Sequence, residues 1–223
     1  MNVRTAILAS SLFLFQGTEV FSQDKAAADN YTTVLKQRTY KIVAPLGITD
    51  SVKFFRVQNI ITNQYRALGA VHDSANAKIK SLKASETNKE VLANAVKAIE
   101  DARMVELDKL HKPYIAALSK ELTPAQLIAV KDGMTYSVLP VTVKAYDEML
   151  PSLTKDQKKQ ILIYLTEARE YAMDAESSEK KHAWFGKYKG KINNYLSAAG
   201  IDMKKAGQEW EERIKAAKTN TKN

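Results

Sequence analysis

Cysteine is absent from the 223-residue sequence, and glycine and proline are scarce, with eight and five residues. The missing thiols exclude a disulfide framework, a cysteine nucleophile and a thiolate metal site. The shortage of helix-breaking residues leaves room for long helices. Because no covalent link supports the fold, a hydrophobic core has to supply the stability, and an apolar content of 45% is ordinary for that purpose.

Familiar catalytic and metal-binding motifs are also missing. The sequence has no Gly-x-Ser-x-Gly elbow and no glycine-rich phosphate loop. Its three histidines, His72, His111 and His182, are far apart and lack the i, i+4 spacing of a helical zinc site. The sequence therefore predicts no cofactor, no metal and no catalytic residue.

The first 22 residues resemble a secretory signal peptide. Arg4 gives the short N-terminal region a positive charge, and residues 6–15 form an apolar run. Residues 20–22 end in a small side chain just before the expected cleavage site. An uncleaved anchor is the alternative, but the run is too short to span a bilayer, and no later run is long enough. We expect a periplasmic or secreted protein without a membrane span.

The formal net charge of +9 is unevenly spread. Residues 23–84 hold ten Lys/Arg against four Asp/Glu, and residues 178–200 hold five against one. Such asymmetry can steer an acidic partner to one face. Outside the cytoplasm we expect that partner to be a polyuronate, a membrane headgroup or an acidic polypeptide rather than a nucleic acid. Solvated lysines that maintain solubility are the simpler alternative.

Helical periodicity dominates the chain after residue 22, and no segment alternates with period two. The pattern predicts an all-α single domain of packed helical hairpins over residues 23–218, followed by a frayed tail at 219–223. Pro113 is expected to kink or divide the third helix. The seven or eight expected helices are 31–43, 50–82, one from Ser85 or Thr87 to about 118, 124–131, 140–150, 155–176, 179–198 and 203–218.

Two helix starts share the sequence Leu-Thr-x-x-Gln, at residues 122–126 and 153–157. In each, the threonine and glutamine are spaced for a capping box, and Asp202 is placed to cap the last helix. The pair resembles the Leu-Thr-x-x-Gln periplasmic proteins, which include small helical chaperones. That resemblance implies the alternative function of a chaperone-like or envelope-stress protein.

A broader resemblance rests on three segments: KDGMTYSVLP at 131–140, MLPSLT at 149–154 and KHAWFGKYKGKINNYL at 181–196. Together they resemble an uncharacterised secreted helical family of polysaccharide-degrading bacteria, often encoded near pectin-degradation enzymes. The family carries a label of sugar binding. The resemblance implies an exported protein of glycan utilisation, and it implies no catalytic residues.

The helix predicted at 179–198 gathers its large apolar side chains on one face, which is typical of a core-facing stripe. Trp184 lies at the edge of that stripe. Another ridge holds polar side chains and two glycines, which each cost a helix up to about 1 kcal/mol relative to alanine. Close packing of a second helix would explain the glycines, and so would a shallow ligand groove. The ligand-binding candidates on this helix are His182, Trp184, Gly186, Lys189, Gly190 and Asn193.

Arg103 lies in the middle of an apolar stripe, between Ile99 and Leu107. A buried arginine is seldom unpaired, so one interpretation is a structural ion pair. The other is a guanidinium that faces a pocket and grips a ligand carboxylate.

These features favour an exported protein that binds rather than catalyses. The leading hypothesis is an accessory carbohydrate-binding protein for an oligosaccharide, which the basic segments suggest is acidic. A glycosidase with two carboxylates from distant helices is the enzymatic alternative. Nothing in the sequence determines the oligomeric state.

Overall fold

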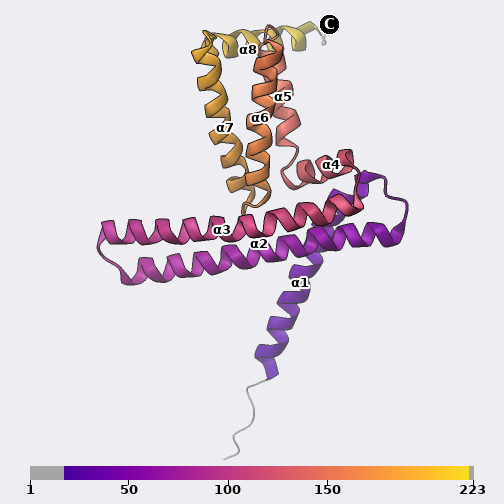
Figure 1. Cartoon of the computed structure of the whole chain (residues 1–223), viewed down its shortest axis with the longest axis vertical. Coiled ribbons are helices and arrows are strands. Elements are labelled where there is room, and N and C mark those ends of the chain that lie inside the picture. The colour runs from indigo at the N-terminus through magenta and orange to yellow at the C-terminus, as the bar shows by residue number, and fades with distance from the viewer. Residues whose placement is uncertain (1–17, 221–223) are drawn as a thin grey trace, which may run out of the picture.

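Two long antiparallel helices form a base, and a bundle of shorter helices stands on them (Figure 1). The computed structural model describes the backbone of residues 18–220 and the side chains of residues 30–218. Within this range every regular element is helical, which confirms the predicted all-α class. The elements are α1 (Thr18–Val43), the 3₁₀ turn η1 (Ala44–Leu46), α2 (Ser51–Ser85), α3 (Lys89–Glu121), α4 (Pro124–Met134), α5 (Val138–Met149), α6 (Lys155–Met173), α7 (Ser178–Ala198) and α8 (Met203–Asn220).

Part of the predicted signal peptide, residues 1–17, lies outside the described residues, as do residues 221–223 of the predicted tail. In the part of the chain that is described, no helix combines the length and the apolar character that a membrane crossing needs.

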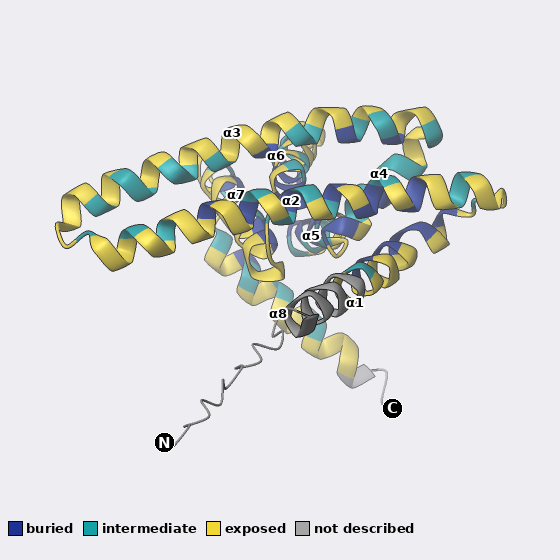
Figure 2. Cartoon of the chain, turned by 90° about the horizontal axis from the view of Figure 1, so that it is seen from below, coloured by how far each residue is buried: buried dark blue, intermediate teal, exposed yellow. Residues whose placement is uncertain are grey.

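Helix pairs α2–α3 and α6–α7 are the predicted hairpins, and each encloses part of a core. The base core lies where α1, η1 and α4 pack on the α2–α3 hairpin, and Val57, Leu118 and Met134 are almost fully buried in it. The bundle core lies between α5, α6, α7 and α8, around Phe185 and Ile192. Figure 2 shows that the hairpin is buried beside these elements and exposed toward its turn near Ser85.

One residue links the two cores. Met173, the last residue of α6, is fully buried in the base core, although its neighbour Ala172 belongs to the bundle core. The C-terminus of α6 therefore reaches into the base, and the two layers form a single domain.

The predicted helix caps are confirmed. Thr123 and Thr154 each accept a hydrogen bond from the backbone amide of the glutamine three residues on. The side-chain oxygen of each glutamine in turn accepts a hydrogen bond from the backbone amide of the threonine. Asp202 accepts from the amide of Lys205 at 3.0 Å. These side chains satisfy amides that have no partner inside the helix.

Several predicted boundaries are wrong, including the end of the helix expected at 124–131, which continues to Met134. The first helix begins at Thr18 rather than at residue 31, because residues 25–29, KAAAD, favour a helix without forming an apolar stripe. Neither Ser85 nor Thr87 starts α3, because Asn88 caps it by accepting from the amides of Glu90 and Val91.

Pro113 does not divide α3. Its ring is exposed, and the helix continues on both sides of it. Helix α6 ends at Met173 rather than at residue 176, so residues 174–177 form a connection to α7. This last difference places Asp174 and Glu176 in a loop between the two layers.

We expect Thr154→Ala to lower the free energy of unfolding by about 1 kcal/mol, because the amide of Gln157 loses its acceptor. Thr154→Ser keeps the hydroxyl and should lie within a few tenths of a kcal/mol of the parent protein. Urea unfolding followed by circular dichroism would measure both. Equal losses for the two variants would contradict a capping role.

Candidate functional site

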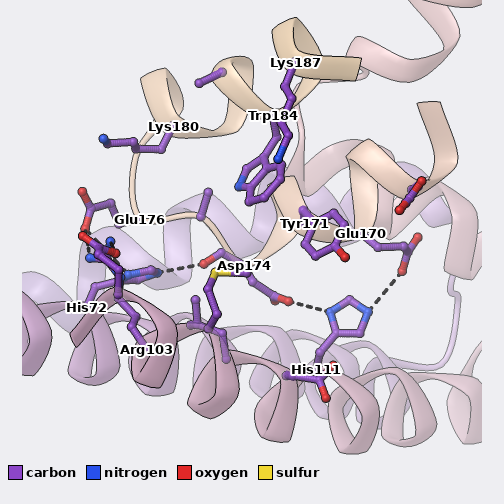
Figure 3. Close-up of a pocket in the computed structure, with 17 residues that line it drawn as sticks. His72, Arg103, His111, Glu170, Tyr171, Asp174, Glu176, Lys180, Trp184 and Lys187 are labelled. Atoms are coloured by element: carbon purple, nitrogen blue, oxygen red, sulfur yellow. Dashed lines mark hydrogen bonds and ion pairs between the residues drawn. The ribbon is translucent and has the colours of Figure 1, made fainter. Parts of the chain in front are cut away.

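A cavity of about 560 Å³ lies where the base and the bundle meet. Helix α3 and His72 of α2 form one side of it. The end of α6, the connecting loop and the start of α7 form the other side (Figure 3). The cavity thus lies between two helical hairpins, α2–α3 and α6–α7, that are distant from each other in sequence.

Asp174 holds the connecting loop to both helices of the base hairpin. Its backbone carbonyl oxygen accepts a hydrogen bond from Nε2 of His72 at 2.8 Å. Its Oδ2 atom lies 2.7 Å from Nδ1 of His111. Because a carbonyl oxygen only accepts, Nε2 of His72 must carry its hydrogen.

Lys181, on α7, holds the end of α6 where the connecting loop begins. This lysine is buried, and its Nζ donates to the carbonyl oxygens of Ala172 and Met173, both at 2.9 Å. Burial lowers its pKa from 10.5 to about 8. The ammonium caps the C-terminus of α6, where carbonyl groups lack partners within the helix.

His111 lies between two carboxylates. Its Nε2 atom is 3.2 Å from Oε2 of Glu170, so both ring nitrogens face acidic oxygens and both carry hydrogens. The hydrogen bonds to Asp174 and then to Glu170 outweigh burial and raise the pKa of His111 from 6.5 to about 9. His111 is therefore an imidazolium at neutral pH.

Glu170 is ionised in this arrangement. Burial alone would raise its pKa, but hydrogen bonds from His111 and from Lys131, whose Nζ is 2.6 Å away, outweigh burial and lower the pKa to about 2. Lys131 comes from α4, so the charged cluster joins three helices and the loop. The positive charges of His111 and Lys131 balance the negative charges of Glu170 and Asp174.

Arg103 is ion-paired, as the first interpretation predicts, and it also lines the cavity. Its guanidinium bonds to Glu100, and its Nη1 atom lies 3.6 Å from Oε2 of Glu176. Nη1 also donates to Oδ1 of Asn76 at 3.2 Å. Only 15% of its side chain is exposed.

Aromatic side chains form the facing wall of the cavity. Trp184 extends from α7 toward the base, as Figure 3 shows. Its ring stacks on Tyr171 with centroids 4.6 Å apart and planes inclined by 16°. The Nζ atom of Lys187 lies 4.9 Å from the indole centroid, within the range of a cation–π contact. Trp184 is thus the exception to the buried stripe, while Phe185 and Tyr188 are core residues.

The remaining candidates on α7 lie away from the cavity, and the structure does not bring them together with Arg103. None of the five lines it: His182, Gly186, Lys189, Gly190 and Asn193. His182 stacks on Tyr136 with centroids 5.7 Å apart, and Asn193 accepts a hydrogen bond from Tyr146 at 2.8 Å. A Cβ atom built on Gly186 or Gly190 would meet nothing within 4 Å. Close packing of a second helix is therefore not the reason for these glycines.

Sequence reasoning missed His111, Glu170, Tyr171 and Asp174. His111 lies four residues, about one helical turn, after Leu107. This spacing alone could have predicted that His111 shares the inward face of α3. Asp174 was assigned to a helix, and its contact with two histidines depends on where α6 ends. Among the described residues, no group of three His, Asp or Glu side chains is arranged to hold a metal ion.

The fold and the cavity define an all-helical protein with a ligand-sized space at the junction of its two layers. The chain belongs to the family described as "Protein of unknown function (DUF3826)", whose model matches residues 32–216. No curated protein matches the chain.

The raised pKa of His111 makes stability depend on pH. Because the folded pKa of about 9 exceeds the ordinary 6.5, the stabilisation is complete below pH 6.5 and is lost as pH rises through 9. We expect His111→Gln to lower the free energy of unfolding by about 3 kcal/mol at pH 6, with a smaller difference at pH 10. Exposed His182 offers a control, and His182→Gln should change the free energy of unfolding little. A His111→Gln effect that is constant across this range would refute the assignment.

The open surroundings of Gly186 and Gly190 predict that Gly186→Ala and Gly190→Ala each stabilise the protein by about 0.5–1 kcal/mol. The added methyl group meets no atom, and alanine has the better helix propensity. Thermal unfolding would measure the gain. A loss of stability would mean that another chain segment packs on this ridge.

Proposed function

We propose that the chain is an exported carbohydrate-binding protein whose ligand occupies the cavity between Trp184 and the loop that carries Asp174. The observation that supports this best is the stacked pair of Trp184 and Tyr171 facing a wall of charged side chains across a cavity of about 560 Å³. Export rests on the pattern of residues 1–22, which resembles a signal peptide.

The chemistry of the two walls matches that of a sugar. The C–H faces of a pyranose pack against aromatic rings, and its hydroxyls both donate and accept hydrogen bonds. Carboxylates in the cavity can accept from hydroxyls, and Lys180 at its edge can donate to them. The volume lies within the range of about 300–1,000 Å³ that small-ligand sites occupy, which suits one to three sugar units.

The state of Glu170 does not suit the general acid of a glycosidase. A glycosidase needs a carboxylic acid whose pKa is raised so that it can protonate the leaving group. The pKa of Glu170 is instead lowered to about 2, and its Oε2 is bound by His111 and Lys131. This carboxylate is prepared to accept a hydrogen bond and not to donate a proton.

The chaperone alternative rested on the two Leu-Thr-x-x-Gln segments. In the structure, Thr123 and Thr154 with their glutamines are fully used as capping boxes. These segments therefore add no support for a client-binding surface.

Intrinsic fluorescence offers a direct test because the sequence has only two tryptophans. Trp210→Phe leaves Trp184 as the single indole, so a sugar that enters the cavity should shift its emission. We expect Trp184→Ala or Tyr171→Ala to weaken binding by about tenfold or more in calorimetry, because a stacking surface is lost.

His182→Ala is the matched control, because this exposed residue lies on the same helix but outside the cavity. It should leave the affinity unchanged. If neutral and acidic oligosaccharides all fail to bind, or if Trp184→Ala binds as well as the parent protein, the proposal is wrong.

A further inference from the structure

The cavity does not share the positive charge of the whole chain. The chain carries a net charge of +9. Six carboxylates line the cavity, against three lysine or arginine side chains and the imidazolium of His111. The carboxylates belong to Glu100, Asp108, Glu167, Glu170, Asp174 and Glu176. Two further lysines outside the lining, Lys131 and Lys112, pair with Glu170 and Asp108. Six positive charges therefore balance the six carboxylates, and an anion that enters this space meets no net attraction.

The deep cations of the cavity are already paired. Arg103 is bound to Glu100 and Glu176, and His111 is bound to Asp174 and Glu170. A ligand carboxylate could take Arg103 or His111 only by leaving a partly buried carboxylate without its partner, which is costly.

The two remaining lining cations, Lys180 and Lys187, are exposed at the edge. Lys187 also lies against the Trp184 ring. Solvent therefore screens their charge, and their attraction for an anion is weaker than that of a buried cation.

Two buried acceptors in the cavity wall lack a hydrogen-bond donor, Oδ1 of Asp174 and Oε1 of Glu170. Asp174 is only 8% exposed, and its Oδ1 atom has no hydrogen-bond partner. Buried acceptors without partners are rare in folded proteins, so a ligand hydroxyl that reached either oxygen would supply the missing hydrogen bond. Because His111 and Lys131 already balance the charges of Asp174 and Glu170, a neutral hydroxyl suits this place better than an ammonium group.

We infer that the cavity selects uncharged, hydroxyl-rich saccharides and discriminates against uronates. This inference rests on the proposed function and narrows its ligand class. It also reverses the expectation, drawn from the basic segments of the sequence, that an oligosaccharide ligand is acidic. In this arrangement Arg103 keeps Glu100 and Glu176 in place and does not grip the ligand.

A matched ligand pair tests the inference. Trigalacturonate and its fully methyl-esterified form share one backbone and differ in charge, and neutral gluco-, galacto-, manno- and xylo-oligosaccharides complete the panel. We expect calorimetry to show that at least one neutral sugar binds about tenfold or more tightly than trigalacturonate. Its affinity should change little between about 50 and 500 mM salt, because no net charge is screened.

Each outcome of the panel has a separate meaning. Tighter binding of trigalacturonate than of every neutral sugar would overturn the inference and leave carbohydrate binding intact. Failure of all sugars to bind would overturn both. Tighter binding of a neutral sugar supports both.

Variants that replace a carboxylate with an amide test whether charge is the reason that uronates are excluded. Glu100→Gln removes one of the two carboxylates that hold Arg103 and should improve trigalacturonate binding by about tenfold, while neutral sugars change less than about threefold. Glu106→Gln is the control, because Glu106 is on the same helix, pairs with Lys109 and lies outside the cavity. Unchanged trigalacturonate affinity in Glu100→Gln would show that charge is not what excludes uronates.

Discussion

The paired contacts of Asp174 with His72 and His111 are the interaction on which the arrangement of the molecule depends. One residue uses its backbone carbonyl oxygen toward α2 and its carboxylate toward α3, and so fixes the end of α6 against both helices of the base. Breaking a partly buried pair of this kind leaves a charge without compensation. The position of the bundle, and with it the position of Trp184 over the base, follows from this contact.

The cavity exists because this junction is polar. Apolar layers would close against each other at the density of a protein interior. Here the charged cluster around His111 and Glu170 holds the two layers together through directional bonds. These bonds form only where a donor meets an acceptor, so the two layers are joined at these points and not along their whole length. The same groups that secure the fold thus form one face of the candidate site.

The sequence predicted elements far better than contacts. Helical periodicity and capping boxes are local signals, so the all-α class, the Thr123 and Thr154 caps and the burial of Phe185 were all accessible. Trp184 and Arg103 were identified one by one, but nothing local shows that α3 and α7 face each other. The decisive error concerned the end of α6, because a helix extended to residue 176 conceals the loop that carries Asp174.

The burial of Met173 in the base core also has a consequence for how the protein unfolds. Helix α6 contributes Ala172 to one core and the next residue to the other. The bundle cannot separate from the base without removing a fully buried side chain from the base core. Partial opening of the junction therefore costs free energy in the base core as well as in the bundle. The two cores therefore behave as one cooperative unit in spite of the polar cavity between them.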